Sequence, residues 1–304
     1  MKNIINYYYL LDCSELRMLE KNYIFSSNNQ IFIFYSVEDV DIQNISFILN
    51  KIQYIPYIHT PIYNKDKQLI TLVGNNKYIL FKINIKQNRN IQIKDLFDFY
   101  NIIKNYLGEI NNIFRWNDLW KEKIDYLEYY INSKDDIKNE IKCLFTYYIG
   151  LGENAISYLK NISETNNIDY FDKMGIVHKR LSCKYTLYDL YNPLTFVIDH
   201  ISRDISEYLK SVFFEGNYDC STIEKIIKNA DLSEFGYKLL YARLLFPTFF
   251  FDLLDKYESD NFSSYEILDI FNMTKRYEEY LIIIYEIIKK SRKINLPRLA
   301  WLYR

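Results

Sequence analysis

The chain has 304 residues, of which 49% are hydrophobic and 25% are charged, a composition typical of a globular protein with one large or two smaller domains. Its formal net charge of −1 provides no overall field that would attract nucleic acid, so we expect no nucleic-acid partner. The 31 tyrosines are an unusual excess, which the codon composition of an AT-rich genome would explain.

Four cysteines are widely spaced along the chain: Cys13, Cys143, Cys183 and Cys220. They form no CxxC pair and fit neither a zinc site nor a disulfide framework, so we expect reduced and mostly buried thiols. The N-terminal stretch lacks the small-residue cleavage site of a signal peptide. The most apolar long run, residues 239–254, is interrupted by Arg243 and Pro247 and falls short of a membrane span.

Residues 1–82 are expected to form a small, strand-rich lobe. The apolar run 31–37 predicts a strand, and the runs 69–73 and 78–83 predict a hairpin. Apolar residues at a helical spacing predict a helix over residues 42–52.

Residues 83–304 are expected to form a larger, mainly helical lobe. Apolar stripes at helical spacing run along residues 93–107 and 116–131, and the tryptophans of the second stripe are expected in the core. A turn is expected at Gly150–Gly152, between two apolar segments. The fold class that follows from the order of these elements is α+β, with two lobes.

Three further helices are expected near the C-terminus, over about 221–229, 233–255 and 263–290. Pro247 is expected to bend or split the second of them. Basic residues at 289–293 suit the C-terminus of the third, and we interpret them as a solvated helix end.

The segment 176–207 carries the candidate chemistry. Two short strands are expected within it, over residues 185–188 and 194–198, joined by a turn, and the second strand ends at Asp199. Asp204 is expected to be the N-cap of the helix that follows.

This order resembles the catalytic segment of the aminoglycoside-phosphotransferase and choline-kinase-like branch of the protein-kinase-like fold. In that branch a His-x-Asp-x-x-x-x-Asn loop precedes a hairpin and an apolar-apolar-Asp sequence. The loop Asp is the base toward the acceptor hydroxyl, and the Asn and the later Asp hold magnesium. Here His178 begins the loop, but Arg180 stands at the base position and Tyr185 at the Asn position. Asp199 matches the later magnesium ligand, and Asp204 matches a structural aspartate of the family.

Three motifs outside this loop point to a narrower group: Tyr147-Tyr148-Ile149-Gly150-Leu151-Gly152-Glu153-Asn154-Ala155-Ile156, Trp116-Asn117-Asp118-Leu119-Trp120 and Arg298-Leu299-Ala300-Trp301-Leu302-Tyr303-Arg304. They are similar to motifs of the spore-coat kinase-like proteins, the CotS and YutH group, and closest to its YutH branch. The resemblance implies a two-lobed protein-kinase-like fold and other spore-coat proteins as partners, with no membrane span. It also implies a location first in the cytoplasm of the mother cell and then in the spore coat.

Several devices of phosphoryl transfer are missing from the sequence. A phosphate-covering loop needs glycines, but the first glycine of the chain is Gly74, at the far side of the small lobe. The strand at 31–35 carries no lysine to pair with phosphates, and only Lys21 and Lys51 flank it. No GxSxG motif and no cluster of histidine, cysteine and carboxylate residues supports another class of enzyme.

We therefore expect a non-catalytic kinase-like protein, a pseudokinase, that is a structural or assembly component of the endospore coat and needs no cofactor. The alternative is a divergent ATP-dependent phosphotransferase acting on a small molecule or a protein, in which Asp199 holds the magnesium of Mg-ATP. That alternative needs a base from Asp189 or Asp204. Arg180 could pair with Asp199 or Asp204 and take the place of the metal. His178 is expected to hold the loop by hydrogen bonding.

Overall fold

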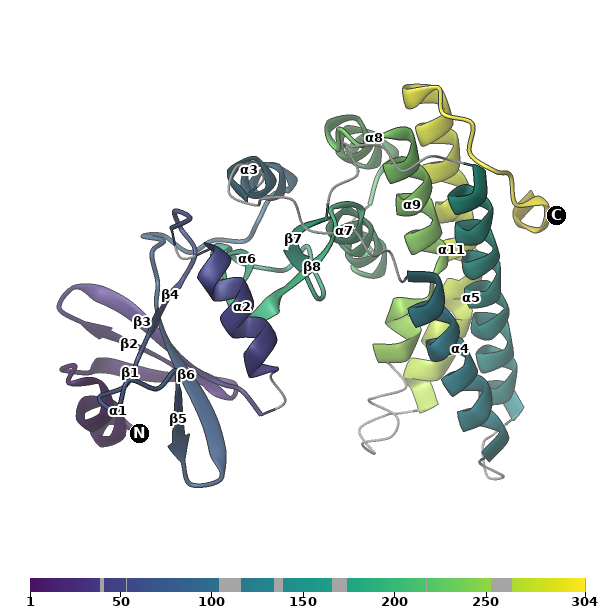
Figure 1. Ribbon diagram of the computed structural model, residues 1–304. Coiled ribbons are helices and arrows are strands. Elements are labelled where there is room, and N and C mark those ends of the chain that lie inside the picture. The colour runs from purple at the N-terminus through teal and green to yellow at the C-terminus, as the bar shows by residue number, and fades with distance from the viewer. Residues whose placement is uncertain are drawn as a thin grey trace. The chain divides into compact units, whose positions relative to one another are not determined.

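The computed structural model describes residues 1–38, 41–52, 54–103, 116–133, 139–165, 174–216, 218–252 and 264–303. The chain forms two compact units (Figure 1): Met1–Gly108 with Ile176–Ile198, and Glu109–Gly175 with Asp199–Arg304. The lobe boundary expected at residue 82 differs from this division, which groups residues 83–108 and 176–198 with the first unit.

The first unit is built on a six-stranded antiparallel sheet. Its strand order is β1-β2-β3-β6-β4, and β5 also pairs with β6. The strands are β1 (Ser14–Leu19), β2 (Asn22–Ser27), β3 (Gln30–Ser36), β4 (Thr60–Ile62), β5 (Ile70–Val73) and β6 (Asn76–Lys82). The strand-rich character expected of this part of the chain is confirmed.

Two helices accompany this sheet. The sequence did not predict α1 (Lys2–Tyr9), which buries Ile5 and Tyr9 in one cluster with Phe34 and other strand residues. The prediction of a helix at 42–52 is confirmed by α2 (Ile42–Ile52), whose buried residues repeat every three or four positions.

The predicted hairpin is also confirmed. Strands β5 and β6 place Val73 opposite Asn76 and enclose Gly74 and Asn75 as the turn. Gly74 has φ +61°, in the left-handed region that glycine adopts at no steric cost. The turns that join β1 to β2 and β2 to β3 are Glu20–Lys21 and Asn28–Asn29, neither of which contains glycine.

The first unit also contains α3 (Ile93–Ile103), α6 (Leu187–Leu190) and η1 (Pro193–Thr195), and β7 (Met174–His178) pairs with β8 (Phe196–His200) in a separate two-stranded sheet. The strand predicted at 185–188 is wrong. Asp189 accepts hydrogen bonds from the backbone N–H and the hydroxyl of Thr186, at 2.8 and 2.7 Å, and this pair begins helix α6.

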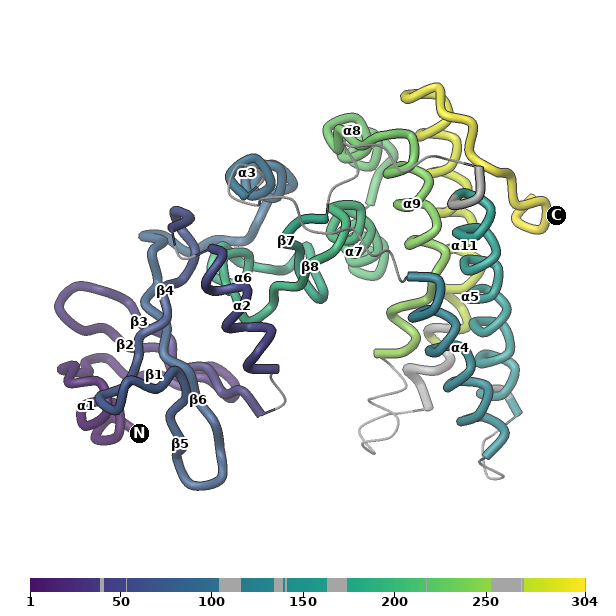
Figure 2. Tube along the Cα trace, in the orientation of Figure 1, coloured from purple at the N-terminus to yellow at the C-terminus, as the bar shows by residue number. Residues whose placement is uncertain are grey.

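The second unit consists of helices: α4 (Trp116–Ser133), α5 (Asn139–Thr165), α7 (Ser202–Phe214), α8 (Cys220–Asn229), α9 (Glu234–Leu245), α11 (Ser264–Arg292) and η2 (Ala300–Tyr303). Figures 1 and 2 show α4, α5, α9 and α11 side by side in one bundle. The break predicted at Pro247 is confirmed, because α9 ends at Leu245 and a new helical turn begins at Thr248. The break predicted after Ser133 falls on residues outside the described ranges.

The turn predicted at Gly150–Gly152 is wrong, because α5 continues through both glycines. A Cβ atom on Gly152 would lie 2.3 Å from Cδ1 of Ile124 on α4, whereas a Cβ on Gly150 would meet nothing within 4 Å. Gly152 is therefore the residue that allows α4 and α5 to approach closely.

Several buried tyrosines of the second unit donate their hydroxyls to backbone carbonyls of neighbouring elements. Tyr277 donates to Leu244 O at 2.7 Å, and Tyr280 donates to Leu209 O at 2.9 Å. A buried hydroxyl costs free energy unless it is hydrogen-bonded, so these contacts allow aromatic side chains to fill the bundle core. Part of the tyrosine excess thus serves helix packing.

All four cysteines are free. The expectation of mostly buried thiols is wrong for Cys143 and Cys220, which are exposed on α5 and α8, while Cys13 is buried. Among the helices that the structure describes, none combines the length and the apolar character needed to cross a membrane.

Candidate functional site

His178 lies at the end of β7 and is fully buried. Its Nε2 atom is 2.9 Å from the backbone oxygen of Leu190, at the end of α6. The imidazole packs against the rings of Phe99 and Phe196, with centroid distances of 5.0 and 5.2 Å. The contact of His178 with Leu190 thus connects the end of α6 to the end of strand β7.

The loop after β7 is closed by Tyr185, the residue at the Asn position of the kinase-like motif. Its hydroxyl donates to the backbone oxygen of Arg180 at 2.5 Å, and its N–H donates to Ser182 O at 3.0 Å. The guanidinium of Arg180 donates to the backbone oxygen of Lys179 at 3.1 Å. The hydroxyl of Tyr185 is thereby committed to the loop backbone.

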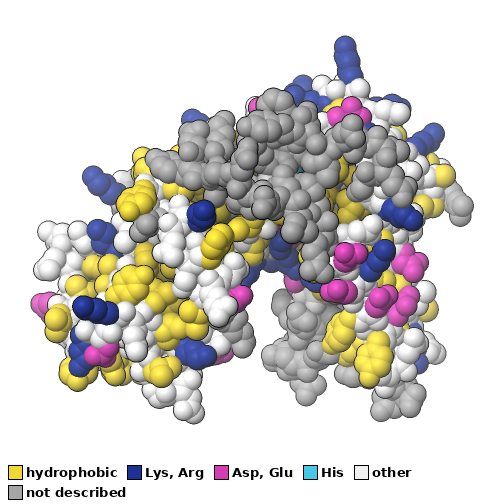
Figure 3. Space-filling model, viewed as in Figure 1, with side chains coloured by type: hydrophobic (Ala, Val, Ile, Leu, Met, Phe, Trp, Pro, Cys, Tyr) yellow, Lys and Arg dark blue, Asp and Glu magenta, His cyan; other side chains and the backbone are white. Residues whose placement is uncertain are grey.

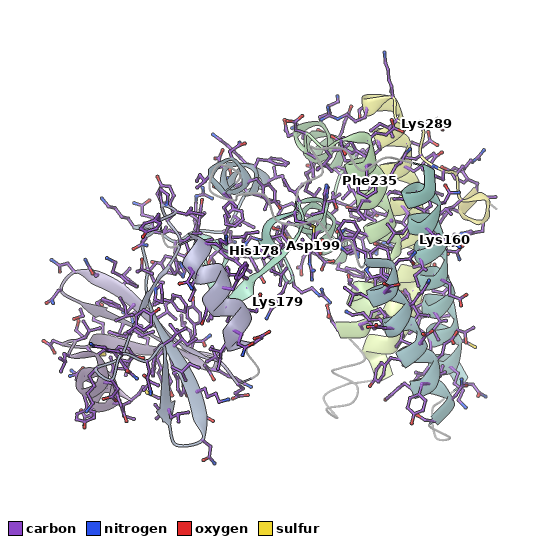
Figure 4. All side chains as sticks on the ribbon, viewed as in Figure 1. Lys160, His178, Lys179, Asp199, Phe235 and Lys289 are labelled. Carbon is purple, nitrogen blue, oxygen red and sulfur yellow. The ribbon has the colours of Figure 1, made fainter. Side chains whose placement is uncertain are left out.

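Asp199 is 4% exposed and lies in β8, just before α7 (Figure 4). Its Oδ1 atom accepts hydrogen bonds from Trp116 Nε1 at 2.8 Å, from the His200 N–H at 2.6 Å and from Arg243 Nη2 at 2.5 Å. Its Oδ2 atom accepts one from Arg203 Nη1 at 2.9 Å. Both carboxylate oxygens are therefore engaged with protein donors.

The side-chain donors to Asp199 come from three helices of the second unit. Trp116 is the first residue of α4, Arg203 lies in the first turn of α7, and Arg243 lies in the last turn of α9. The Arg243 guanidinium is buried and lies over the Trp116 ring, 5.2 Å from its centroid, a cation–π geometry. We call Asp199, Arg203, Arg243 and Trp116 the Asp199 cluster.

Opposing effects act on the charges of the Asp199 cluster. Burial raises the pKa of Asp199, but the guanidinium groups of Arg243 and Arg203 and the His200 N–H outweigh it, so the pKa lies below its ordinary value. Burial lowers the pKa of Arg243, and Asp199 opposes that shift. Because the ordinary pKa of arginine is above 12, Arg243 stays cationic, and the cluster holds one carboxylate with two guanidinium groups.

The start of α7 differs from the sequence-based expectation. The helix begins at Ser202, so Asp204 is its third residue and not its N-cap. The backbone N–H of Ser202 instead donates to Nδ1 of His200 at 3.1 Å. Asp204 is fully buried.

The donor set around Asp199 does not fit a magnesium ion. Mg²⁺ takes oxygen ligands in near-octahedral geometry, whereas the described contacts of Asp199 are all N–H donors, and two of them carry positive charge. Asp189, one of the two carboxylates considered as a replacement base, accepts hydrogen bonds from Thr186. No group of three or more histidine, cysteine or acidic residues is placed to hold a metal within the described ranges.

The two lysines considered as phosphate ligands have contacts of their own in the first unit. Lys21 is an exposed turn residue, 3.5 Å from Glu38 Oε2. Lys51 lies on α2, with its ammonium 5.7 Å from the centre of the Phe47 ring.

Sequence reasoning identified Asp199 but missed its partners. In the structure, Asp199 forms ion pairs with the guanidinium groups of Arg203 and Arg243, whereas the sequence had suggested Arg180 as its partner. A signal for Arg243 was available, since a lone cation within the apolar run 239–254 requires a buried counter-ion. Trp116 gave no such signal, because it lies 83 positions before Asp199 and its spacing suited the core equally well.

A protein-family model described as "Spore coat putative kinase YutH" matches residues 2–283. The chain belongs to this YutH family. The Endospore coat-associated protein YutH of Bacillus subtilis (strain 168) is 28% identical over 333 aligned positions, which cover 99% of this chain and 98% of that protein. The resemblance stated from the sequence motifs is confirmed.

Solved structures of phosphotransferases share the fold of this YutH-family chain. An aminoglycoside phosphotransferase from Alicyclobacillus acidocaldarius is 9% identical with a TM-score of 0.62, covering 97% of both chains. Choline kinase LicA from Streptococcus pneumoniae is 13% identical with a TM-score of 0.55, covering 92% of this chain and 97% of its own. The kinase-like α+β fold is therefore confirmed, and at these identities the likeness concerns the fold alone.

Proposed function

We propose that this YutH-family protein is a pseudokinase that has lost phosphoryl transfer and is a structural or assembly component of the spore coat. The Asp199 cluster carries the proposal. A kinase-like protein needs this aspartate free to hold magnesium on the phosphates, and here its carboxylate is neutralised by Arg203 and Arg243.

The ion pairs of the Asp199 cluster make magnesium binding at Asp199 unfavourable. For Asp199 to coordinate magnesium, Arg243 would have to give up a buried ion pair at 2.5 Å. Breaking a buried pair costs about 3–5 kcal/mol, because the guanidinium of Arg243 would be left buried without a counter-ion. The remaining guanidinium would also repel a divalent cation.

Two features of the first unit support the same proposal. The turns Glu20–Lys21 and Asn28–Asn29 lack the glycines with which a phosphate-covering loop brings backbone N–H groups to a nucleotide. The Tyr185 hydroxyl donates to the Arg180 carbonyl, at the position where a kinase-like loop presents an Asn ligand.

The coat role rests on the family. The matching family is described as a spore coat family, and the Bacillus subtilis relative is named as endospore coat-associated. We extend this association to the present chain, with other coat proteins as its partners and the mother-cell cytoplasm as the place where it is made.

A thermal melt with and without about 1 mM Mg-ATP tests the loss of nucleotide binding. A ligand at about 100 times its dissociation constant would add about 2.7 kcal/mol of stability. That gain would raise the midpoint by roughly 5–10 °C, at about 2–4 °C per kcal/mol. We expect no shift for the wild-type chain. The alternative, a divergent phosphotransferase, requires a shift that disappears in Asp199→Asn, a variant that keeps the shape of the side chain and loses its charge.

The same melt on Arg243→Met tests the reason for the loss. If Arg243 is what keeps magnesium from Asp199, Arg243→Met should acquire a Mg-ATP-dependent shift that the wild-type chain lacks. No shift in Arg243→Met would show that Arg243 is not the reason for the loss. A wild-type shift that persists in Asp199→Asn would show that a nucleotide binds elsewhere, and the role assigned to the Asp199 cluster would be wrong.

A further inference from the structure

The side of α4 that faces away from the bundle carries acidic and apolar residues together. At 3.6 residues per turn, six exposed residues share one arc of this side, Asp118, Leu119, Glu122, Asp125, Tyr126 and Tyr129, and the exposed residues Lys121, Asn132 and Ser133 lie beside them. Leu119, Tyr126 and Tyr129 are 48%, 49% and 72% exposed. The space-filling view shows acidic side chains, with basic ones among them, above hydrophobic ones over α4 (Figure 3). We call the first six residues the acidic–aromatic face; its three carboxylates outnumber the neighbouring ammonium group of Lys121, so this side of α4 is net negative.

A surface of the opposite charge lies where the C-terminal ends of α8 and α11 meet. Arg292 joins these ends by donating to the backbone oxygens of Ile227, at 3.2 Å, and Lys228. Five exposed lysines surround this junction and are called the lysine cluster: Lys225, Lys228, Lys289, Lys290 and Lys293. Figure 4 labels Lys289 at this end of α11. Glu224 pairs with Lys228 at 2.6 Å and offsets one of these charges, so the cluster remains positive.

We propose that the acidic–aromatic face of one copy docks on the lysine cluster of a second copy. The two surfaces have opposite charge, and exposed tyrosine rings can contact both the ammonium groups and the alkyl stems of lysines. The contact gives the structural or assembly role proposed above a partner, a second copy of the chain. Only the biological meaning of the contact rests on that proposed role.

The geometry of this contact makes the assembly open-ended. Both surfaces belong to the second unit but to different helices, so the contact joins unlike patches and is not reciprocal. A heterologous contact of this kind leaves one free surface of each type at the two ends of a dimer. Further copies add head to tail unless the rotation between copies closes a ring.

Sedimentation velocity of the full chain, without nucleotide, tests the inference. Between about 1 and 100 µM protein at low ionic strength, we expect the weight-average sedimentation coefficient to rise with concentration. The rise should shrink at least severalfold in about 0.5 M salt, where screening acts within a few ångströms. A chain that stays monomeric over this range would overturn the proposal.

Two charge reversals give the sharper test. The face variant Glu122→Lys/Asp125→Lys and the cluster variant Lys289→Glu/Lys293→Glu should each lose self-association. The first variant makes both surfaces positive, and the second cancels the positive charge of the cluster, because two new glutamates and Glu224 then oppose the three remaining lysines. An equimolar mixture should regain it, since each variant then meets a complementary surface on the other. Glu128→Lys is the matched control, an exposed residue on the flank of α4 outside the face, and should associate like wild type.

The outcomes show whether the acidic–aromatic face of one copy binds the lysine cluster of another. If association survives both reversals, self-association uses another surface and the proposal is wrong. If each variant loses association but the mixture does not regain it, the two surfaces do not bind each other, and the proposal fails equally. A wild-type melt that shifts with Mg-ATP would overturn the pseudokinase proposal and leave these outcomes unchanged.

Discussion

Replacing Asp199 by alanine is expected to destabilise the second unit by about 3–5 kcal/mol, the usual consequence of leaving a buried charge without its partner. The change removes the counter-ion of Arg243, which is buried and paired at 2.5 Å. It also removes the acceptor of the Trp116 indole N–H. At about 2–4 °C per kcal/mol, the melting temperature should fall by roughly 6–20 °C.

Urea unfolding followed by circular dichroism at pH 7 is the appropriate assay, because the midpoint and slope together report the free energy of unfolding. Asp219→Ala is a suitable comparison. Asp219 is an exposed N-cap of α8 that accepts from the Thr222 N–H at 2.9 Å, and its loss should cost only about 1 kcal/mol.

A loss below about 1 kcal/mol in Asp199→Ala would refute the structural role of the carboxylate. An aspartate kept for a metal contributes to function at some expense of stability, so its removal would be neutral or stabilising. The double variant Asp199→Ala/Arg243→Met should be more stable than the sum of the single losses predicts, with a coupling of about 1–3 kcal/mol. Independent effects in that cycle would show that the two side chains do not stabilise each other.

Three further predictions concern positions outside the Asp199 cluster. Gly150→Ala should stabilise α5 by about 0.5–1 kcal/mol, whereas Gly152→Ala should destabilise the unit by about 1–2 kcal/mol, since only the second Cβ meets α4; equal effects in urea unfolding would contradict the packing argument. Burial lowers the pKa of His59 to about 3 from 6.5, and neither ring nitrogen has a hydrogen-bond partner among the described residues. Below about pH 6.5 the unfolded chain therefore binds a proton at His59 that the folded chain does not. As the pH falls below about 6.5, the free energy of unfolding should decrease by up to about 1.4 kcal/mol per pH unit. Unfolding measured at pH 7 and pH 5 should show a smaller decrease for His59→Phe than for the wild-type chain. Lys210 is buried and donates to Phe246 O and Thr248 Oγ1, both at 2.8 Å. Lys210→Met should therefore lower the free energy of unfolding by about 1–3 kcal/mol, whereas Lys228→Met, at an exposed position, should lower it by less than about 1 kcal/mol. A similar loss in both variants would refute the contribution of the buried Lys210 hydrogen bonds.

Local patterns were sufficient to predict several elements. The helix at 42–52 and the hairpin around Gly74 are specified by residues close together in the chain, namely an apolar stripe and a glycine with positive φ. Strand β1 (Ser14–Leu19) was missed because nearly all of its residues are exposed and leave no alternating pattern of buried side chains.

Long-range contacts account for the main errors. Gly152 was interpreted as a turn residue because glycine is a local helix breaker, whereas its role depends on Ile124 in another helix. The same limit applied at the candidate site. Asp199 was found by its place after a strand, but Arg243 lies 44 positions away, and only the packing of α7 and α9 brings them together.

The burial of the tyrosines also determines which of them an oxidant in solution can reach. Phenol rings couple through radicals only where the rings of two molecules can meet, and Tyr277 and Tyr280 are enclosed in the helix bundle with burial raising the pKa of both. Tyr54 and Tyr129, 79% and 72% exposed, are open to such chemistry. If this chain becomes covalently joined to neighbouring proteins through tyrosine, the bonds will form at exposed rings such as these, and the bundle core will be untouched.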